Sequence, residues 1–179
     1  AIAGYSAGMR IESLSIVPML AMGNAMSTFT AQNMGAGKID RVKEGYRMCY
    51  VIVLTAGAVL CVMYQLAGGA FVSLFLDSGS SEAYSVGLSY VKFLSFFYSF
   101  IGLKASTDGL LRGAGDVTAF TVANLVNLAI RVSVTNLFAP IYGIQVAWMA
   151  VPLGWAANYV ISFGWYLTGK WKKVRVIKK

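Results

Sequence analysis

Two long runs without a charged residue limit what this chain can fold into. One runs from Met48 to Leu76 and the other from Val132 to Gly169. A helix of about 20 apolar residues crosses the hydrocarbon core of a bilayer, so each run can span it at least once. Only 12% of the chain is charged and 58% is hydrophobic, whereas soluble domains carry about 25% charged residues. The chain is therefore predicted to lie in a membrane.

Five hydrophobic segments are long enough to span a bilayer with some tilt. Stretches such as 51–62 lack the alternation of apolar and polar residues that a membrane β-strand requires, which leaves helices. The prediction is an all-α fold, a polytopic transmembrane helical bundle of five spans that forms a single membrane domain over residues 1–179. The segments run from about Tyr5 to Met34, Met48 to Leu76, Val86 to Leu111, Val117 to Phe138 and Ile144 to Thr168.

Glycine and turn residues separate these segments. Gly-Ala-Gly occurs at 35–37 and again at 113–115, each time followed by a charged residue. Because glycine adopts the left-handed conformation that ends many helices, both places are predicted helix stops. Residues 77–81 and 139–143 separate the other segments.

Lysine and arginine gather on one side of this arrangement. The connector at 35–47, the turn after the third segment and the C-terminal tail hold eleven cations, whereas the connectors at 77–85 and 139–143 hold none. The positive-inside rule places the cations in the cytoplasm. We therefore expect a multi-pass protein of the cell membrane with a cytoplasmic C-terminus, and residue 1 outside, as in a chain cut from a longer protein. The cations are Lys38, Arg41, Lys43, Arg47, Arg112, Lys170, Lys172, Lys173, Arg175, Lys178 and Lys179.

Several function classes are not expected for this composition. Residues 170–179 are predicted to be a basic cytoplasmic tail at the lipid headgroups, and no aromatic-interleaved basic groove suggests nucleic acid as a partner. The chain has no histidine and two cysteines, Cys49 and Cys61. It therefore lacks the residues of a Ser-His-Asp or Cys-His nucleophile and of a zinc site. Neither enzyme activity, a metal nor a cofactor is expected.

Three charged residues lie deep inside predicted spans, where burial is costly and commonly functional. At 1.5 Å of rise per residue, Lys104 and Asp108 lie about 12 and 6 Å inside the cytoplasmic end of their segment, and Arg131 about 21 Å from Val117. Lys104 and Asp108 are four residues apart and share a helix face, which predicts a buried charge pair. The pair either neutralises itself within one helix or takes part in function.

Polar residues form a stripe on the fourth segment. Asn124, Asn127, Arg131 and Thr135 step by three, four and four, which places them on one helix face. A stripe of this kind cannot face lipid. It either bonds to other helices or forms the wall of a solvated transport cavity. Asn124, Asn127 and Arg131, with Asn24 of the first segment, are the candidate substrate-cavity residues.

Two motifs and their spacing are informative together. Gln-Asn-Met-Gly-Ala-Gly-Lys ends the first segment at 32–38, and Leu-Arg-Gly-Ala-Gly-Asp ends the third at 111–116. Shorter stretches accompany them at 10–14, 23–29, 130–132, 142–148 and 169–172. Along essentially its whole length the chain resembles the MATE (multidrug and toxic compound extrusion) family of transporters.

This resemblance implies helices 8–12 of a MATE-like twelve-helix fold, a C-terminal half fragment whose partner is the missing N-terminal half. It implies a secondary active antiporter that exports cationic or amphipathic drugs or toxins in exchange for sodium or protons by alternating access. The family's coupling acids lie mainly on the first helix of a half, so the ion site is expected outside this chain. Where some members add an acid, the stretch around Ile101 is uncharged. A lipid-linked precursor flippase of the same superfamily and a non-transporting membrane subunit are the alternatives.

Overall fold

The computed structural model describes residues 2–76, 81–143 and 145–173. Over these residues the chain forms six α-helices and one short 3-10 helix. Part of the predicted tail (Arg175, Lys178 and Lys179) and the connector at 77–80 lie outside the described residues. The helices are α1 (Ile2–Gly35), α2 (Ile39–Ser73), α3 (Ser81–Ser95), α4 (Tyr98–Gly113), α5 (Val117–Tyr142), α6 (Gln145–Thr168) and η1 (Lys170–Lys173).

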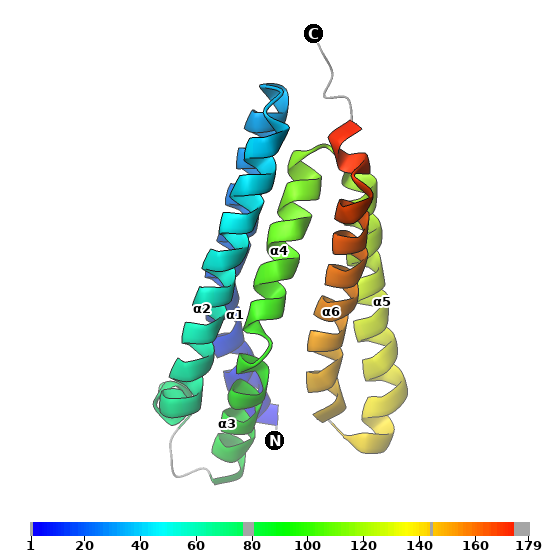
Figure 1. Cartoon of the computed structure of the whole chain (residues 1–179). Helices are drawn as coiled ribbons and strands as arrows, with labels where there is room; N and C mark the ends of the chain where they lie inside the picture. Colours follow the sequence, from blue (N-terminus) through cyan, green and yellow to red (C-terminus); the bar gives the residue numbers. More distant parts are fainter. Residues whose placement is uncertain (1, 77–80, 144, 174–179) are drawn as a thin grey trace.

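The described helices provide four candidate passes through a bilayer, or five if α3 and α4 form one broken span. Helices α1, α2, α5 and α6 are each long and apolar enough to span on their own, and α3 and α4 can together make a fifth span. Figure 1 shows the α1–α2 turn, the α4–α5 turn and η1 at one end of the bundle, and the N-terminus and the α5–α6 turn at the other. The predicted all-α bundle of five spans is confirmed. That the end with η1 faces the cytoplasm stays a prediction.

Two element boundaries differ from the sequence prediction. The third span is divided, because α3 and α4 meet at 96–97 with a bend of 51°. The basic connector is largely helical, since α2 begins at Ile39. Its buried residues Val42, Tyr46 and Cys49 step by four and three, so the packed face of the helix continues beyond the apolar run and keeps the basic segment helical.

Glycine ends α1 and α4 in the same way. Gly37 has a φ of 70° and Gly115 a φ of 82°, both in the left-handed region. In the first turn the N–H of Lys38 donates to the carbonyl oxygen of Asn33 at 2.8 Å, and the second turn repeats this bond after its own glycine. The bonds satisfy carbonyl groups that the helix ends would leave free. Both predicted helix stops are confirmed.

Small residues let α1 and α4 cross closely. Ala105, Gly109 and Gly113 repeat every four residues, so they lie on one face of α4. A Cβ on Gly109 would lie 2.1 Å from the backbone oxygen of Gly23, and a Cβ on Gly113 would lie 2.2 Å from that of Ser27. The two backbones are therefore in direct contact. This contact fixes the position of α1 along the axis of α4. Both helices carry residues of the candidate functional site described below.

Candidate functional site

A network of polar side chains connects α4, α5 and α6 inside the bundle. Lys104 Nζ lies 2.9 Å from Asp108 Oδ2, and the two side chains are 14% and 7% exposed. Lys104 Nζ also donates to Asn124 Oδ1 at 3.1 Å. The structure thus places a buried charge pair on α4 and joins it to one residue of the α5 stripe.

Asp108 is the centre of this network. Its Oδ2 accepts a hydrogen bond from Asn124 Nδ2 at 3.2 Å, and its Oδ1 accepts one from Ser162 Oγ at 2.6 Å. Ser162 and Asn158, which lies one turn before it on α6, are both fully buried and were not predicted as site residues from the sequence. Their four-residue spacing within an uncharged run could have indicated them, because polar residues one turn apart share a helix face. With these bonds, both carboxylate oxygens of Asp108 are satisfied.

A cavity of about 200 Å³ opens beside the network, between α1, α4 and α5. Arg112 reaches across it, and its Nη2 donates to Asn24 Oδ1 at 2.7 Å. The guanidinium carbon lies 5.7 Å from the centre of the Phe120 ring. A polar wall within a membrane bundle requires water, protein or ligand beside it, because lipid cannot satisfy its groups. The polar residues lining the cavity are Asn24, Lys104, Asp108, Arg112 and Asn124.

A larger hollow of about 250 Å³ lies at the bend between α3 and α4, against α6. Aromatic and aliphatic side chains form its wall, so it offers no group that could neutralise a charged ligand. The smaller, polar cavity is therefore the candidate site. The residues lining the larger hollow are Phe93, Phe97, Phe100, Met149, Pro152, Leu153 and Ala156.

The structure separates residues that the sequence analysis grouped into one cavity wall. Asn127 and Arg131 do not line the polar cavity. They cover Gly154 of α6, where an added Cβ would lie 2.3 Å from Asn127 Oδ1 and 2.8 Å from Arg131 Cγ. The physical reason is that α5 packs far more extensively on α6 than on α4. Only the part of the stripe near Asn124 meets α4.

Arg131 instead lies toward the end of the bundle where the chain begins. Its guanidinium is close enough to interact electrostatically with Glu12 of α1. The Tyr90 hydroxyl of α3 donates a hydrogen bond to Glu12 Oε2. The Tyr90 ring also packs edge-on against Trp148 of α6, with ring centres 5.4 Å apart. These residues connect α1, α3, α5 and α6 at a level separate from the polar cavity.

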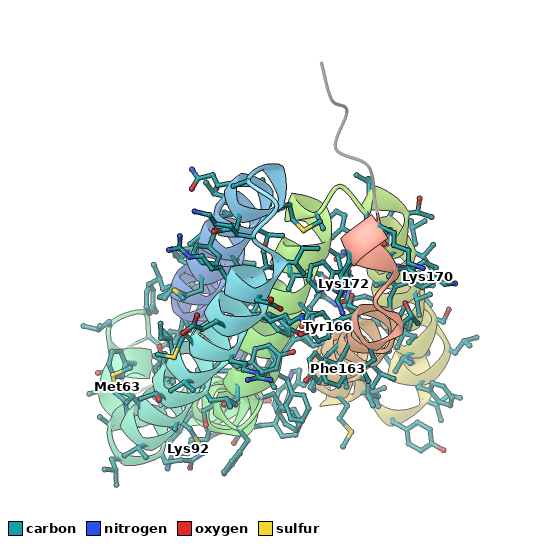
Figure 2. All side chains as sticks on the ribbon, turned by 45° about the horizontal axis from the view of Figure 1, so that its top comes forward. Met63, Lys92, Phe163, Tyr166, Lys170 and Lys172 are labelled. Carbon is teal, nitrogen blue, oxygen red and sulfur yellow. The ribbon has the colours of Figure 1, made fainter. Side chains whose placement is uncertain are left out.

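Hydroxyl groups and aromatic rings join α2 to the helices that carry the network. Thr107 Oγ1 lies 2.7 Å from the Tyr46 hydroxyl and 2.9 Å from the Tyr50 hydroxyl. The Tyr46 ring is 4.6 Å from the Tyr166 ring of α6. Figure 2 shows Tyr166 on the side of α6 that faces α2 and α4. These contacts hold α4 and α6 at the spacing that the Asp108–Ser162 bond needs.

Asp116 positions the beginning of α5. Its Oδ1 accepts from the backbone N–H of Ala119 at 3.3 Å, which caps the helix. Its Oδ2 accepts from Trp165 Nε1 of α6 at 2.6 Å. The first turns of α5 are therefore held against α6, and Asn124, two turns later, keeps its place beside Asp108.

Comparison with known proteins decides which family this architecture represents. Residues 1–151 match the family model described as MatE. This chain belongs to the MatE family. A probable multidrug resistance protein, YpnP, of Bacillus subtilis (strain 168) is 28% identical over 98% of this chain and 39% of its own length. A second probable multidrug resistance protein, NorM, of Thermotoga maritima (strain ATCC 43589 / DSM 3109 / JCM 10099 / NBRC 100826 / MSB8) is 22% identical over 100% of this chain and 39% of its own length.

A solved structure supports the MatE fold. It is described as the inward-facing conformation of a multidrug resistance MATE family transporter of the MOP superfamily, and it matches with a TM-score of 0.81. The match covers 99% of this chain and 38% of that chain at 18% identity, a level that shows the fold alone. The chain spans about two fifths of the length of the proteins it matches. The predicted MATE family and its helical membrane fold are confirmed.

Proposed function

We propose that the complete protein is a secondary active antiporter that exports cationic or amphipathic drugs or toxins in exchange for sodium or protons. The observation that carries this proposal is the polar cavity between α1, α4 and α5. Charged groups inside a membrane bundle are costly, and they are commonly kept where a ligand or ion must pass. The two relatives described as probable multidrug resistance proteins support the proposal.

Antiport requires a site that opens alternately to the two sides of the membrane. The close α1–α4 crossing favours movement of these helices as one body against the rest of the transporter. The coupling ion is proposed to bind outside this chain, because both oxygens of Asp108 already accept hydrogen bonds. Lys104 and Asp108 then serve to keep the cavity wall polar without an unpaired buried charge.

A non-transporting membrane subunit fits these observations less well. Packing alone predicts that every buried polar atom finds a partner on a neighbouring helix. Among the described residues, Asn127 Oδ1 and Asn158 Nδ2 are buried without a hydrogen-bond partner. Neither residue lines the polar cavity, so these unpaired groups favour further positions inside the bundle that water or a ligand completes.

Ethidium efflux tests the proposed function. Expression of the complete reading frame in a pump-deficient cell is expected to speed ethidium efflux above the vector control. An inward sodium or proton gradient should accelerate export, and ionophores that collapse the gradient should abolish the gain. Efflux at the vector rate, or a gain that survives loss of both gradients, would contradict antiport.

A variant pair on α5 relates that activity to the cavity. Asn124 lines the cavity, whereas Val122 is 47% exposed and does not line it. Asn124→Ala is therefore expected to slow efflux by about tenfold or more, since it removes hydrogen bonds to both charged groups, each worth about 1.5–3 kcal/mol. Val122→Ala should keep the wild-type rate at equal expression. Equal rates for the two variants would remove the cavity from the transport route.

A further inference from the structure

We propose that the cavity between α1, α4 and α5 binds an anionic group of the substrate, either a carboxylate or a phosphate. The inference rests on the proposed function and names the chemical group that docks at this site. Drugs and toxins that are amphipathic include compounds with an acidic group, with or without a cationic centre.

The cavity wall has one more positive charge than negative charge. Lys104, Arg112 and Asp108 are the charged residues that line it. Lys104 and Asp108 neutralise each other at 2.9 Å. No carboxylate in the described part of the chain forms an ion pair with Arg112. Its guanidinium is therefore the charge that a ligand in the cavity would meet unneutralised.

The two cationic residues of the cavity wall also have N–H donors to spare for a ligand. Arg112 donates from Nη2 to Asn24 Oδ1 at 2.7 Å and from Nε to Ser27 Oγ at 3.4 Å. Its Nη1 has no partner among the residues that the structure describes. Lys104 uses two of its three N–H donors, on Asp108 and Asn124. Carboxylate and phosphate oxygens accept charge-assisted bonds from such donors, and a guanidinium matches their planar or bidentate geometry.

The same wall offers a cationic group no free carboxylate oxygen. The carboxylate of Asp108 has both oxygens bonded, to Lys104 and Asn124 at Oδ2 and to Ser162 at Oδ1. A cation in the cavity would have to displace these bonds and lie near two like charges, which costs free energy. The site therefore favours an anionic group over a cationic one beside Arg112, whatever charge the rest of the substrate carries.

The dimensions of the cavity suit one acidic group with the beginning of an organic skeleton. Its volume is about 200 Å³, and Leu20 and Phe120 add apolar surface beside the charged residues. Arg112 lies at the end of α4 and Lys104 about 12 Å deeper, measured along the helix. The two donors thus lie along a path from the predicted cytoplasmic face into the bundle. An acidic group on this path would meet Arg112 at the outer end and Lys104 at the inner end.

Two probe pairs test this inference on the purified full-length protein in detergent, by equilibrium dialysis. Rhodamine 110 carries a free carboxylate that its methyl ester, rhodamine 123, lacks. Flavin mononucleotide carries a phosphate that riboflavin lacks. Wild-type protein is expected to bind the acidic member of at least one pair about tenfold more tightly, the scale of one charge-assisted hydrogen bond. Preference in the first pair alone assigns a carboxylate, and preference in the second alone a phosphate.

Substitutions of Arg112 provide a second test of the inference. Arg112→Gln should abolish the preference for the acid, whereas Arg112→Lys should keep part of it by charge without the guanidinium geometry. Arg47→Gln is the matched control, because Arg47 is exposed on α2 and does not line the cavity. The wild-type comparison needs no variant, so it remains decisive where Arg112→Gln fails to fold.

Each outcome bears on one of the two proposals. Wild-type protein that binds rhodamine 123 and riboflavin as tightly as the acidic probes, or a preference that Arg112→Gln leaves intact, would overturn the anionic site. Ethidium efflux without any preference for acids would do the same and leave the transport function standing. Preference for acids without efflux of any probe would retain the anionic site and overturn the antiporter.

Discussion

Replacing Asp108 with alanine is expected to destabilise the protein by roughly 3–5 kcal/mol, because removing one partner of a buried ion pair leaves the other charge uncompensated. The Lys104 side chain is only 14% exposed, so water from the cavity replaces the lost carboxylate only in part. Asn124 and Ser162 each lose one of their two acceptors at the same time. The measurement is the free energy of unfolding of the full-length protein in mild detergent, from titration with sodium dodecyl sulfate.

An exposed ion pair in the same chain provides the control. Lys43 Nζ lies 2.7 Å from Asp40 Oδ1, and the Asp40 side chain is 95% exposed. Asp40→Ala is expected to leave the unfolding free energy unchanged, because exposed pairs contribute little. The double variant Lys104→Met with Asp108→Leu should recover most of the loss, since removing both charges leaves none unpaired. Equal losses for the two single aspartate variants would contradict the buried pair.

Gly109→Ala is expected to separate α1 from α4 and to lose at least about 1–3 kcal/mol, the usual scale of overpacking. The added Cβ would lie 2.1 Å from the backbone oxygen of Gly23, so a helix backbone has to move rather than a flexible side chain. Because Asn24 follows Gly23 directly, the Arg112–Asn24 bond across the cavity should lengthen. Thermal unfolding in detergent and binding of the acidic probes should therefore both weaken.

Gly164→Ala is the matched substitution for this test. Gly164 is an exposed glycine in α6, and no atom of the described residues lies within 4 Å of its added Cβ. Alanine in a helix interior is favoured over glycine by roughly 0.5–1 kcal/mol, so this variant should be as stable as wild type or slightly more stable. The close crossing would be refuted if Gly109→Ala unfolded at the same temperature as Gly164→Ala.

The helices and their order could be predicted because the signals are local. Uncharged length predicts spans, and glycine followed by a charged residue predicts the stops at Gly37 and Gly115. The bend at 96–97 could not be predicted in this way, since the residues there are two phenylalanines and no proline or glycine marks the break. The start of α2 at Ile39 also depended on packing, because Val42 and Tyr46 are buried by other helices.

The site could be predicted where its partners share a helix and not where they lie on different helices. Lys104 and Asp108 are one turn apart on α4, so their spacing alone brings them together. Ser162 reaches Asp108 from α6, and which face α6 presents depends on the packing of the whole bundle. The same dependence separates Arg131 from Asn124, because α5 turns most of its stripe toward α6 rather than α4.

The most direct test of the account is the access of water to the polar cavity in the membrane. Asn124→Cys and Leu128→Cys, each in a background without other cysteines, would be treated in membranes with an anionic, membrane-impermeant methanethiosulfonate. Asn124 lines the cavity, whereas Leu128, one turn later on α5, is 58% exposed on the apolar surface. Labelling is expected to be rapid at 124 and slow at 128. Equal rates at the two positions, or faster labelling at 128, would contradict this expectation.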